Sequence, residues 1–177
     1  MDSKFSKLVQ QVQAHTGNCQ ESIDDFKACT NIPELVQVMK KYWATLIDEA
    51  PQQLKAVFAA NYKTYAAEIN KAGLYYNEIP SRGIVLIGDM PKSVKNPIEV
   101  HSSMKSLHVY VVGKAYVRLH GDARCYCNCP DAVIELRDIS VANVRAGRAI
   151  ARNQSNLTII GKDYEQYDAA HVVSLLK

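Results

Sequence analysis

Three cysteines and one histidine lie close together in the sequence, and side chains of these two types bind zinc. Cys125, Cys127 and Cys129 alternate with other residues, and His120 precedes Cys125 by five positions. Three thiolates and an imidazole complete a tetrahedral zinc site. On an extended strand, however, Cys-x-Cys places both sulfurs on one face about 7 Å apart, too far for one ion. Cysteine is also among the most buried residue types, so we expect Cys125 and Cys127 to pack in a core, with zinc binding as the alternative.

The sequence contains none of the common motifs that mark a catalytic site. Walker A, G-x-G-x-x-G, H-E-x-x-H and G-x-S-x-G patterns are all absent. His101, His108, His120 and His171 offer imidazoles for acid–base chemistry, but no neighbouring residues mark any of them as catalytic. We therefore expect a non-enzymatic protein with no catalytic residue, no resident metal and no cofactor.

A group of arginines and tyrosines is suited to binding an acidic partner. Residues 92–162 contain eleven Lys/Arg and five Asp/Glu, a net charge of +6, against −1 for residues 1–91 and −2 for residues 163–177. Guanidinium groups bind phosphates, and tyrosine rings stack on bases. Solubility alone is the simpler explanation of such charge. The residues that we expect on this partner or polyanion surface are Tyr116, Arg118, Arg124, Tyr126, Arg137, Arg145 and Arg148.

These residues belong to a repeat of about eight residues that runs from Lys105 to Gly161. Its units are KSLHVYVV, GKAYVRLH, GDARCYCN, PDAVIELR, DISVANVR, AGRAIARN and QSNLTIIG, with Cys129 as one extra residue at an outward-facing corner. A short fixed period indicates a solenoid, in which each unit stacks on its neighbours. Positions three, five and seven are mostly small or apolar, so alternation along a strand predicts that they face the core.

Two further features of the repeat lead to structural expectations. Strict periodicity would bury Arg148 and Arg152, so a one-residue shift that buries Ala149 and Ala151 instead is favoured. If two units make one turn, the solenoid is only a few turns long. The residues at position eight of successive units would form a polar ladder if they align down one edge of the solenoid. Its members would be His120, Asn128, Arg137, Arg145 and Asn153.

The segment GKAYVRLHGDARCYCN…PDAVIELRDISVANVR resembles the short-repeat β-solenoid proteins of bacteria and phages, and is loosely similar to bactofilin-like polymer-forming proteins. The resemblance covers residues 105–162. It implies a β-solenoid that serves as a scaffold, a fibre element or a binding surface, with an origin in a phage or other mobile element among the options. It brings no catalytic residues. Hexapeptide acyltransferases also use a β-solenoid, but their repeat has six residues and needs a histidine with a supporting motif.

The first 73 residues show the apolar spacing of helices. Asn31, followed three residues later by Glu34, is typical of a helix N-terminus, and Pro51 ends the long apolar stripe that follows. We expect helices at about 5–12, 21–28, 32–47 and 52–71.

The expected architecture is therefore α+β, with a helical module at 1–80, a β-solenoid at 84–162 and a C-terminal cap or tail at 163–177. Without an apolar leader or a membrane-length apolar run, we expect the protein in the cytoplasm of the producing cell. The expected function is to present the solenoid to a protein partner or to a second copy of the chain, as a homo-oligomer. Binding of nucleic acid or another polyanion to the basic face is the alternative, and a solenoid acyltransferase is the third option.

Overall fold

The computed structural model describes residues 3–14, 19–90, 93–102 and 107–175. The chain forms two compact units, Met1–Leu74 and Tyr75–Lys177. Residues 163–175 contain two strands that pair with strands of the second unit.

The regular structure of the first unit is mainly helical over its described residues, as expected. No helix in the described part of the chain is long and apolar enough to span a membrane. The helices are α1 (Ser3–Gln13), α2 (Gln20–Ala28), α3 (Ile32–Lys41), α4 (Trp43–Glu49) and α5 (Pro51–Lys71).

Local side-chain chemistry explains where α3 begins and ends. The side chain of Asn31 accepts a hydrogen bond from the backbone N–H of Glu34 (3.0 Å), and the Glu34 carboxylate accepts one from the backbone N–H of Thr30 (2.7 Å). The single helix expected over 32–47 is wrong, because Tyr42 breaks it with φ −101° and ψ 18°. The Tyr42 hydroxyl donates to Asp25 of α2 (2.7 Å), which holds the break in place.

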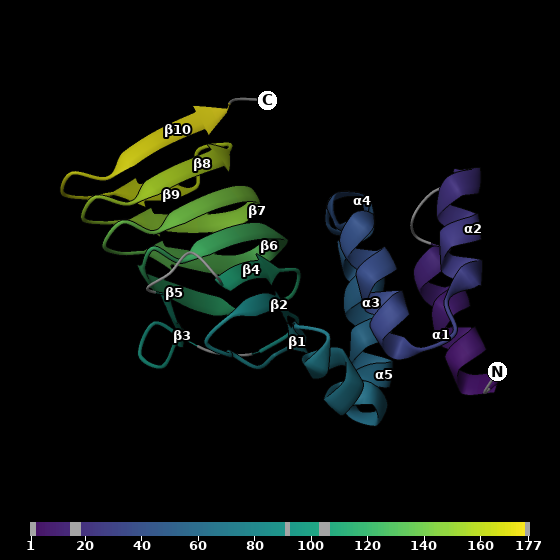
Figure 1. The fold of residues 1–177 in the computed structure, drawn as a ribbon. Helices are drawn as coiled ribbons and strands as arrows, with labels where there is room; N and C mark the ends of the chain where they lie inside the picture. Colours follow the sequence, from purple (N-terminus) through teal and green to yellow (C-terminus); the bar gives the residue numbers. More distant parts are fainter. Residues whose placement is uncertain (1–2, 15–18, 91–92, 103–106, 176–177) are drawn as a thin grey trace. The chain divides into compact units, whose positions relative to one another are not determined.

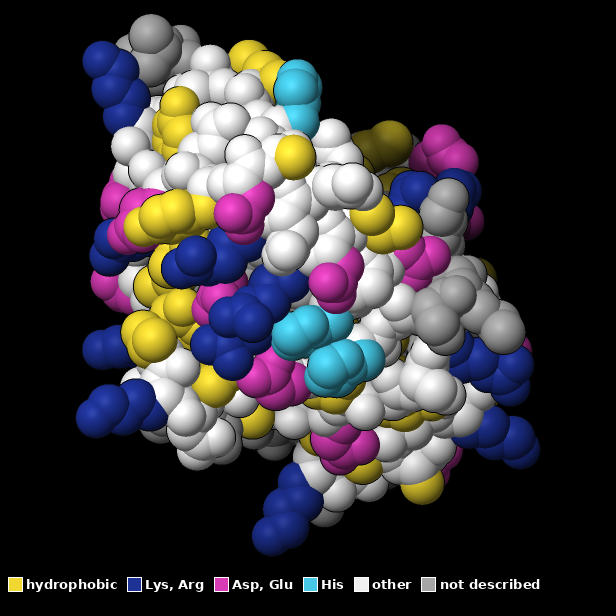
Figure 2. All heavy atoms as spheres, turned by 90° about the vertical axis from the view of Figure 1, so that its left-hand side faces the viewer, with side chains coloured by type: hydrophobic (Ala, Val, Ile, Leu, Met, Phe, Trp, Pro, Cys, Tyr) yellow, Lys and Arg dark blue, Asp and Glu magenta, His cyan; other side chains and the backbone are white. Residues whose placement is uncertain are grey.

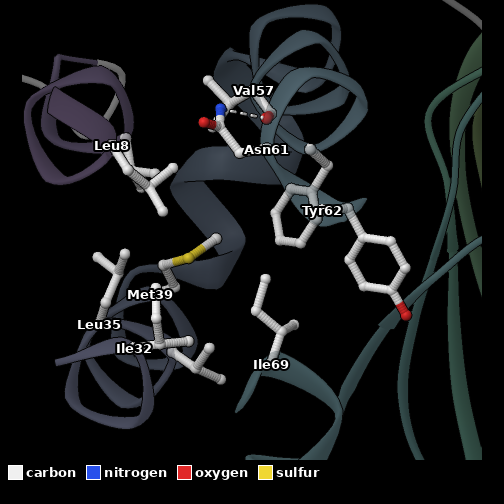
Figure 3. Close-up of a pocket in the computed structure, with 11 residues that line it drawn as sticks. Leu8, Ile32, Leu35, Met39, Val57, Asn61, Tyr62 and Ile69 are labelled. Carbon is white, nitrogen blue, oxygen red and sulfur yellow. Dashed lines mark hydrogen bonds between the residues drawn. The ribbon is translucent and has the colours of Figure 1, made fainter. Parts of the chain in front are cut away.

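The helical unit has an apolar core that leaves little room for a ligand. Leu35, Met39 and Leu54 are almost fully buried, and the side chains that meet at the centre come from α1, α3 and α5 (Figure 3). The cavity between them measures about 20 Å³. That volume is close to the minimum for one water molecule, so this pocket is a packing gap and not a binding site.

The second unit is a parallel β-solenoid of about five turns, with strands stacked in order along its axis (Figure 1). Two strand columns form its two sheets. The strands are β1 (Leu74–Tyr76), β2 (Gly83–Ile87), β3 (Ile98–Ser102), β4 (Leu107–Val111), β5 (Tyr116–Gly121), β6 (Arg124–Leu136), β7 (Val141–Ala151), β8 (Asn156–Ile160), β9 (Tyr164–Gln166) and β10 (His171–Leu175). The first sheet contains β1, β2, β4, the first halves of β6 and β7, then β8 and β10. The second sheet contains β3, β5, the second halves of β6 and β7, then β9.

Each turn contains two of the eight-residue units. Paired residues on the first sheet are 16, 17, 15 and 15 positions apart, in the series His108, Arg124, Val141, Asn156 and His171. Inward residues from both sheets form one continuous apolar core. Strand β3 precedes the clear repeat, but it lies within residues 84–162, where the solenoid is expected.

The two irregularities of the repeat both occur at one corner. Cys129 is an extra residue within β6, but its side chain is buried and not outward-facing as expected. The register between β6 and β7 shifts at this corner, and Ala149 and Ala151 then face the core with no exposed surface. The predicted phase shift is therefore confirmed.

At the other corner, the backbone makes the same tight bend in four successive turns of the solenoid. Its second residue has positive φ each time, at Gly121 (65°), Asp138 (56°), Asn153 (58°) and Asp168 (55°). Glycine, asparagine and aspartate tolerate this left-handed conformation best. At Gly121 a Cβ would also lie 2.1 Å from the carbonyl oxygen of Ser102.

Side chains at this corner also connect successive turns. The Asp138 carboxylate accepts a hydrogen bond from the Gly121 N–H (2.8 Å), and the Asn153 side-chain oxygen accepts one from the Asp138 N–H (3.4 Å). The Asp168 carboxylate accepts one from the Asn153 N–H (3.3 Å). We call Gly121, Asp138, Asn153 and Asp168 the corner ladder.

We predict that Asn153→Ala lowers the free energy of unfolding by about 1–2 kcal/mol, because alanine is strained at positive φ and cannot accept the ladder hydrogen bond. Asn153→Gly should retain more stability than Asn153→Ala, since glycine relieves the strain. Urea unfolding of the three proteins measures the effect. The exposed neighbour Gln154 provides the control, and equal losses in Gln154→Ala and Asn153→Ala would contradict the prediction.

Candidate binding face

The outward side of the second sheet carries most of the charged side chains singled out in the sequence. Figure 2 shows this side of the molecule, where basic and acidic side chains interleave and two histidines lie together. Because neighbouring strands are in register, outward residues stack in columns. One column contains Glu99, Arg118, Glu135, Ile150 and Glu165. We call this outward side the ion-pair face.

Glu135 lies at the centre of the ion-pair face and has four partners. Its Oε2 accepts hydrogen bonds from the Tyr116 hydroxyl (2.9 Å) and from Arg118 Nε (2.8 Å). Its Oε1 accepts from Arg137 Nε (2.9 Å) and Nη2 (2.8 Å), and lies 3.5 Å from Arg152 Nε. The Glu135 side chain is only 4% exposed, so this carboxylate is almost enclosed by its donors.

These partners keep Glu135 ionised. Burial raises its pKa, but hydrogen bonds from Arg118, Arg137 and Tyr116 outweigh burial and lower the pKa to about 2. Tyr116 responds in the opposite direction, because burial and its hydrogen bond to Glu135 raise the pKa of the phenol. The face therefore holds a fixed negative charge at its centre at neutral pH.

A second cluster forms at the β9 end of the ion-pair face. Arg148 forms a hydrogen-bonded ion pair with Glu165 and lies 3.6 Å from Asp163. The Tyr167 hydroxyl donates to Glu165 (2.6 Å), and the guanidinium of Arg152 lies 4.3 Å from the centre of the Tyr167 ring. The arginines are thus fixed in position by both carboxylates and an aromatic ring.

A third cluster lies at the β3 end of the ion-pair face. Glu99 accepts a hydrogen bond from Arg118 Nη1 (2.7 Å), and its other oxygen lies 2.8 Å from His120 Nε2. The His101 and His120 rings are stacked, with centres 4.3 Å apart.

The charges of these clusters balance. Arg118, Arg137, Arg148 and Arg152 are matched by four carboxylates that pair with them, Glu99, Glu135, Asp163 and Glu165. Two of these carboxylates come from the acidic C-terminal segment, which the sequence places outside the basic repeat. The fold therefore removes much of the charge segregation that suggested a polyanion site.

The structure divides the seven residues predicted for a partner surface between two faces. Tyr116, Arg118, Arg137 and Arg148 come together on the ion-pair face, although Tyr116 is covered by its neighbours. The other three lie on the outward side of the first sheet or at its corner. They are Arg124, Tyr126 and Arg145.

The predicted polar ladder of eighth positions is wrong as a single column. Two units make each turn, so alternate eighth positions lie at opposite corners. His120 and Arg137 lie at the corner with positive φ, whereas Asn128 and Arg145 lie at the other.

The cysteine–histidine zinc site is also not formed. Cys125, Cys127 and Cys129 lie in the solenoid core, whereas His120 is part of the outer surface. Burial raises the pKa of Cys127 to about 12 and that of Cys125 well above its usual range, so the thiolates that zinc requires are disfavoured. The expected core packing of Cys125 and Cys127 is confirmed, and Cys129 packs there as well, although it was expected at an outward-facing corner.

Sequence reasoning did not single out Glu99, Glu135, Glu165 or Arg152 as site residues. The sequence does contain a signal for these pairs, because the paired residues are separated by about one full turn, or two repeat units. Arg118 lies 17 positions before Glu135 and 19 positions after Glu99. Comparing residues at this spacing would have placed the opposite charges next to each other.

Comparisons with known proteins add no family assignment, because no protein-family model, curated protein or solved structure matches the chain.

We predict that Glu135→Gln lowers the free energy of unfolding by about 3 kcal/mol at pH 7, because it leaves several cations without their central carboxylate. The depressed pKa of Glu135 stabilises the fold above the ordinary glutamate pKa, and this contribution is lost as the pH falls toward 2. The difference between variant and wild type should therefore shrink between about pH 5 and pH 2. Urea unfolding across this range measures it.

Asp131→Asn is the matched control, because Asp131 is an exposed carboxylate on the same strand. A difference between Glu135→Gln and wild type that stays constant across the pH range would contradict the assigned role of Glu135.

Proposed function

We propose that this chain is a non-enzymatic interaction protein that presents the ion-pair face of its solenoid to a protein partner. The observation that carries the proposal is the equal number of arginines and carboxylates on this face, each arginine held by at least one acidic side chain. The resemblance of the repeats to solenoids of bacteria and phages makes a phage or mobile-element origin part of the same proposal.

The chemical character of the face supports a protein partner. Arginine and tyrosine are enriched at protein interfaces because they combine apolar contact area with hydrogen-bonding groups. The ion-pair face adds apolar side chains between its charges. Val133 and Ile150 are half-buried there and line a depression in the face, which Val94, 62% exposed, also lines.

The rigidity of the face supports the proposal as well. Ordering a long side chain during binding costs about 0.5–1.5 kcal/mol. Arg118 is already held by both Glu99 and Glu135, so little of this cost remains when a partner binds. A partner that contacts the ion-pair face meets a surface already close to its bound conformation.

Nucleic-acid binding is less well supported. Affinity for a phosphate backbone depends on basic side chains that can neutralise phosphates. The arginines of the ion-pair face would first have to leave their carboxylates, which costs the ion pairs that order the surface. We therefore propose protein binding ahead of polyanion binding.

The test is affinity capture with the full chain from cells that produce it, with nuclease treatment, followed by affinity measurement with the purified partner. We predict that the double variant Val94→Ser/Ile150→Ser binds this partner about tenfold or more weakly, because it removes the apolar contacts of the depression. Sedimentation of the purified chain shows whether the partner is a second copy.

Val141→Ser is the control, because Val141 is an exposed valine (40%) on the first sheet. Equal loss in the control and the double variant would contradict a role for the ion-pair face. Capture that nuclease abolishes, with binding to random DNA that weakens steeply with salt, would favour the polyanion alternative.

A further inference from the structure

Three side chains with metal-binding atoms meet at the β3 end of the ion-pair face. Glu99 and His101 come from β3, and His120 comes from β5. One ligand atom from each lies within 4.8 Å of the others. Among the residues that the structure describes, this is the one group of three or more His, Cys, Asp or Glu side chains that meets this condition.

Strand register brings the two histidines together. His101 of β3 pairs directly with His120 of β5, and both side chains point outward from parallel neighbouring strands. Their rings are stacked with an interplanar angle of 10°. Glu99 lies two residues before His101 on the same strand, so its side chain points to the same side.

Glu99 is held in a suitable position. Its Oε1 accepts a hydrogen bond from Arg118, which leaves Oε2 facing His120 Nε2 at 2.8 Å. Arg118 therefore acts as a positioning residue for the carboxylate.

A second carboxylate faces the other nitrogen of His120. Asp138 Oδ2 lies 3.7 Å from His120 Nδ1 and accepts a hydrogen bond from the Gly121 N–H, which fixes its place in the corner ladder. In metal sites, a carboxylate that accepts from one imidazole nitrogen commonly orients the other toward the ion. Asp138 can play this part for His120.

We infer that Glu99, His101 and His120 form a binding site for one divalent transition-metal ion of the zinc class. Two imidazoles and a carboxylate are a ligand set that zinc accepts, with water as a fourth ligand. Hard cations such as Ca²⁺ and Mg²⁺ prefer oxygen ligands alone, so the histidines favour zinc over them.

The ligand atoms lie close enough for this occupant, but the His101 ring must turn out of its stack with His120, because nitrogen lone pairs of parallel rings do not converge on one ion. Tetrahedral zinc with metal–nitrogen distances near 2.0–2.1 Å places its ligand atoms about 3.3 Å apart. The Glu99–His120 contact must lengthen slightly, and His101, which is exposed, must rotate toward both. A bound ion would join β3 to β5, and so fasten the first strand of the second sheet to the next turn.

The experiment titrates Zn²⁺ into the full chain carrying Cys19→Ser and no polyhistidine tag, by calorimetry and in competition with a chromophoric chelator. Cys19→Ser removes the exposed thiol. We expect one Zn²⁺ per chain, a higher melting temperature with zinc, and the visible absorption of tetrahedral cobalt when Co²⁺ replaces it. His101→Ala and Glu99→Gln should each weaken Zn²⁺ binding about tenfold or more.

His171→Ala is the matched control, because His171 is an exposed histidine on β10 and should leave the affinity unchanged. His101 is exposed, so His101→Ala should fold, and its melting temperature in chelator verifies this. Absence of saturable Zn²⁺ binding by the parent protein, or equal affinity of the parent and His101→Ala, would overturn the inference.

Discussion

In-register stacking of parallel strands is the constraint on which the solenoid depends. Each outward side chain lies about 4.8 Å from its counterpart in the next turn, so like charges in one column would repel one another. The column that starts at Glu99 avoids this by alternating with Arg118, Glu135 and then the neutral Ile150. Arg137 and Arg152 occupy neighbouring turns, and both pair with Glu135, which offsets their repulsion. The ion-pair face is thus a consequence of how the turns stack.

The same constraint operates at the corners. The tight bend at the corner recurs in four successive turns of the solenoid and needs a residue at positive φ each time, and the corner ladder supplies glycine, asparagine or aspartate there. Side-chain oxygens of the ladder then accept N–H groups of the preceding turn. The same residues therefore adopt the backbone conformation that the corner needs and connect successive turns. Asp138 also links this corner to the ion-pair face through His120.

Much of the fold could be predicted because alternation and periodicity are local. Small and apolar residues at fixed positions indicated the core, and the unfavourable burial of Arg148 and Arg152 indicated the phase shift. The ion-pair face was harder to predict than the fold. Alternate units lie on opposite sheets, and the repeat alone does not show which side chains become neighbours. For this reason the expected ladder joined His120 to Asn128, and the pairing of Arg118 with Glu135 was missed. Tyr42, where the expected long helix breaks, contacts Asp25 of another helix, and helical periodicity does not indicate such a contact.

The charge balance of the ion-pair face follows from the common register of the stacked turns. That surface is distinct from the basic stripe suggested by composition, since acidic residues from β3, β6 and β9 or its preceding turn neutralise the arginines. A protein partner matches its arginines, tyrosines and apolar side chains better than a phosphate backbone does. The metal site that we infer uses the same register, because only stacking in this phase places His101 next to His120.

The most direct test of this account is disulfide trapping of the register in a Cys19→Ser background. Arg124 pairs with Val141, and both side chains are exposed on neighbouring strands. Arg124→Cys/Val141→Cys should therefore form a disulfide on mild oxidation, detectable by peptide mass. Arg124→Cys/Asn156→Cys spans two strand spacings, about 9.6 Å, which exceeds the reach of a disulfide. A disulfide in the first pair and none in the second is the predicted result; none in the first, or equal yields in both, would contradict the two-unit turn.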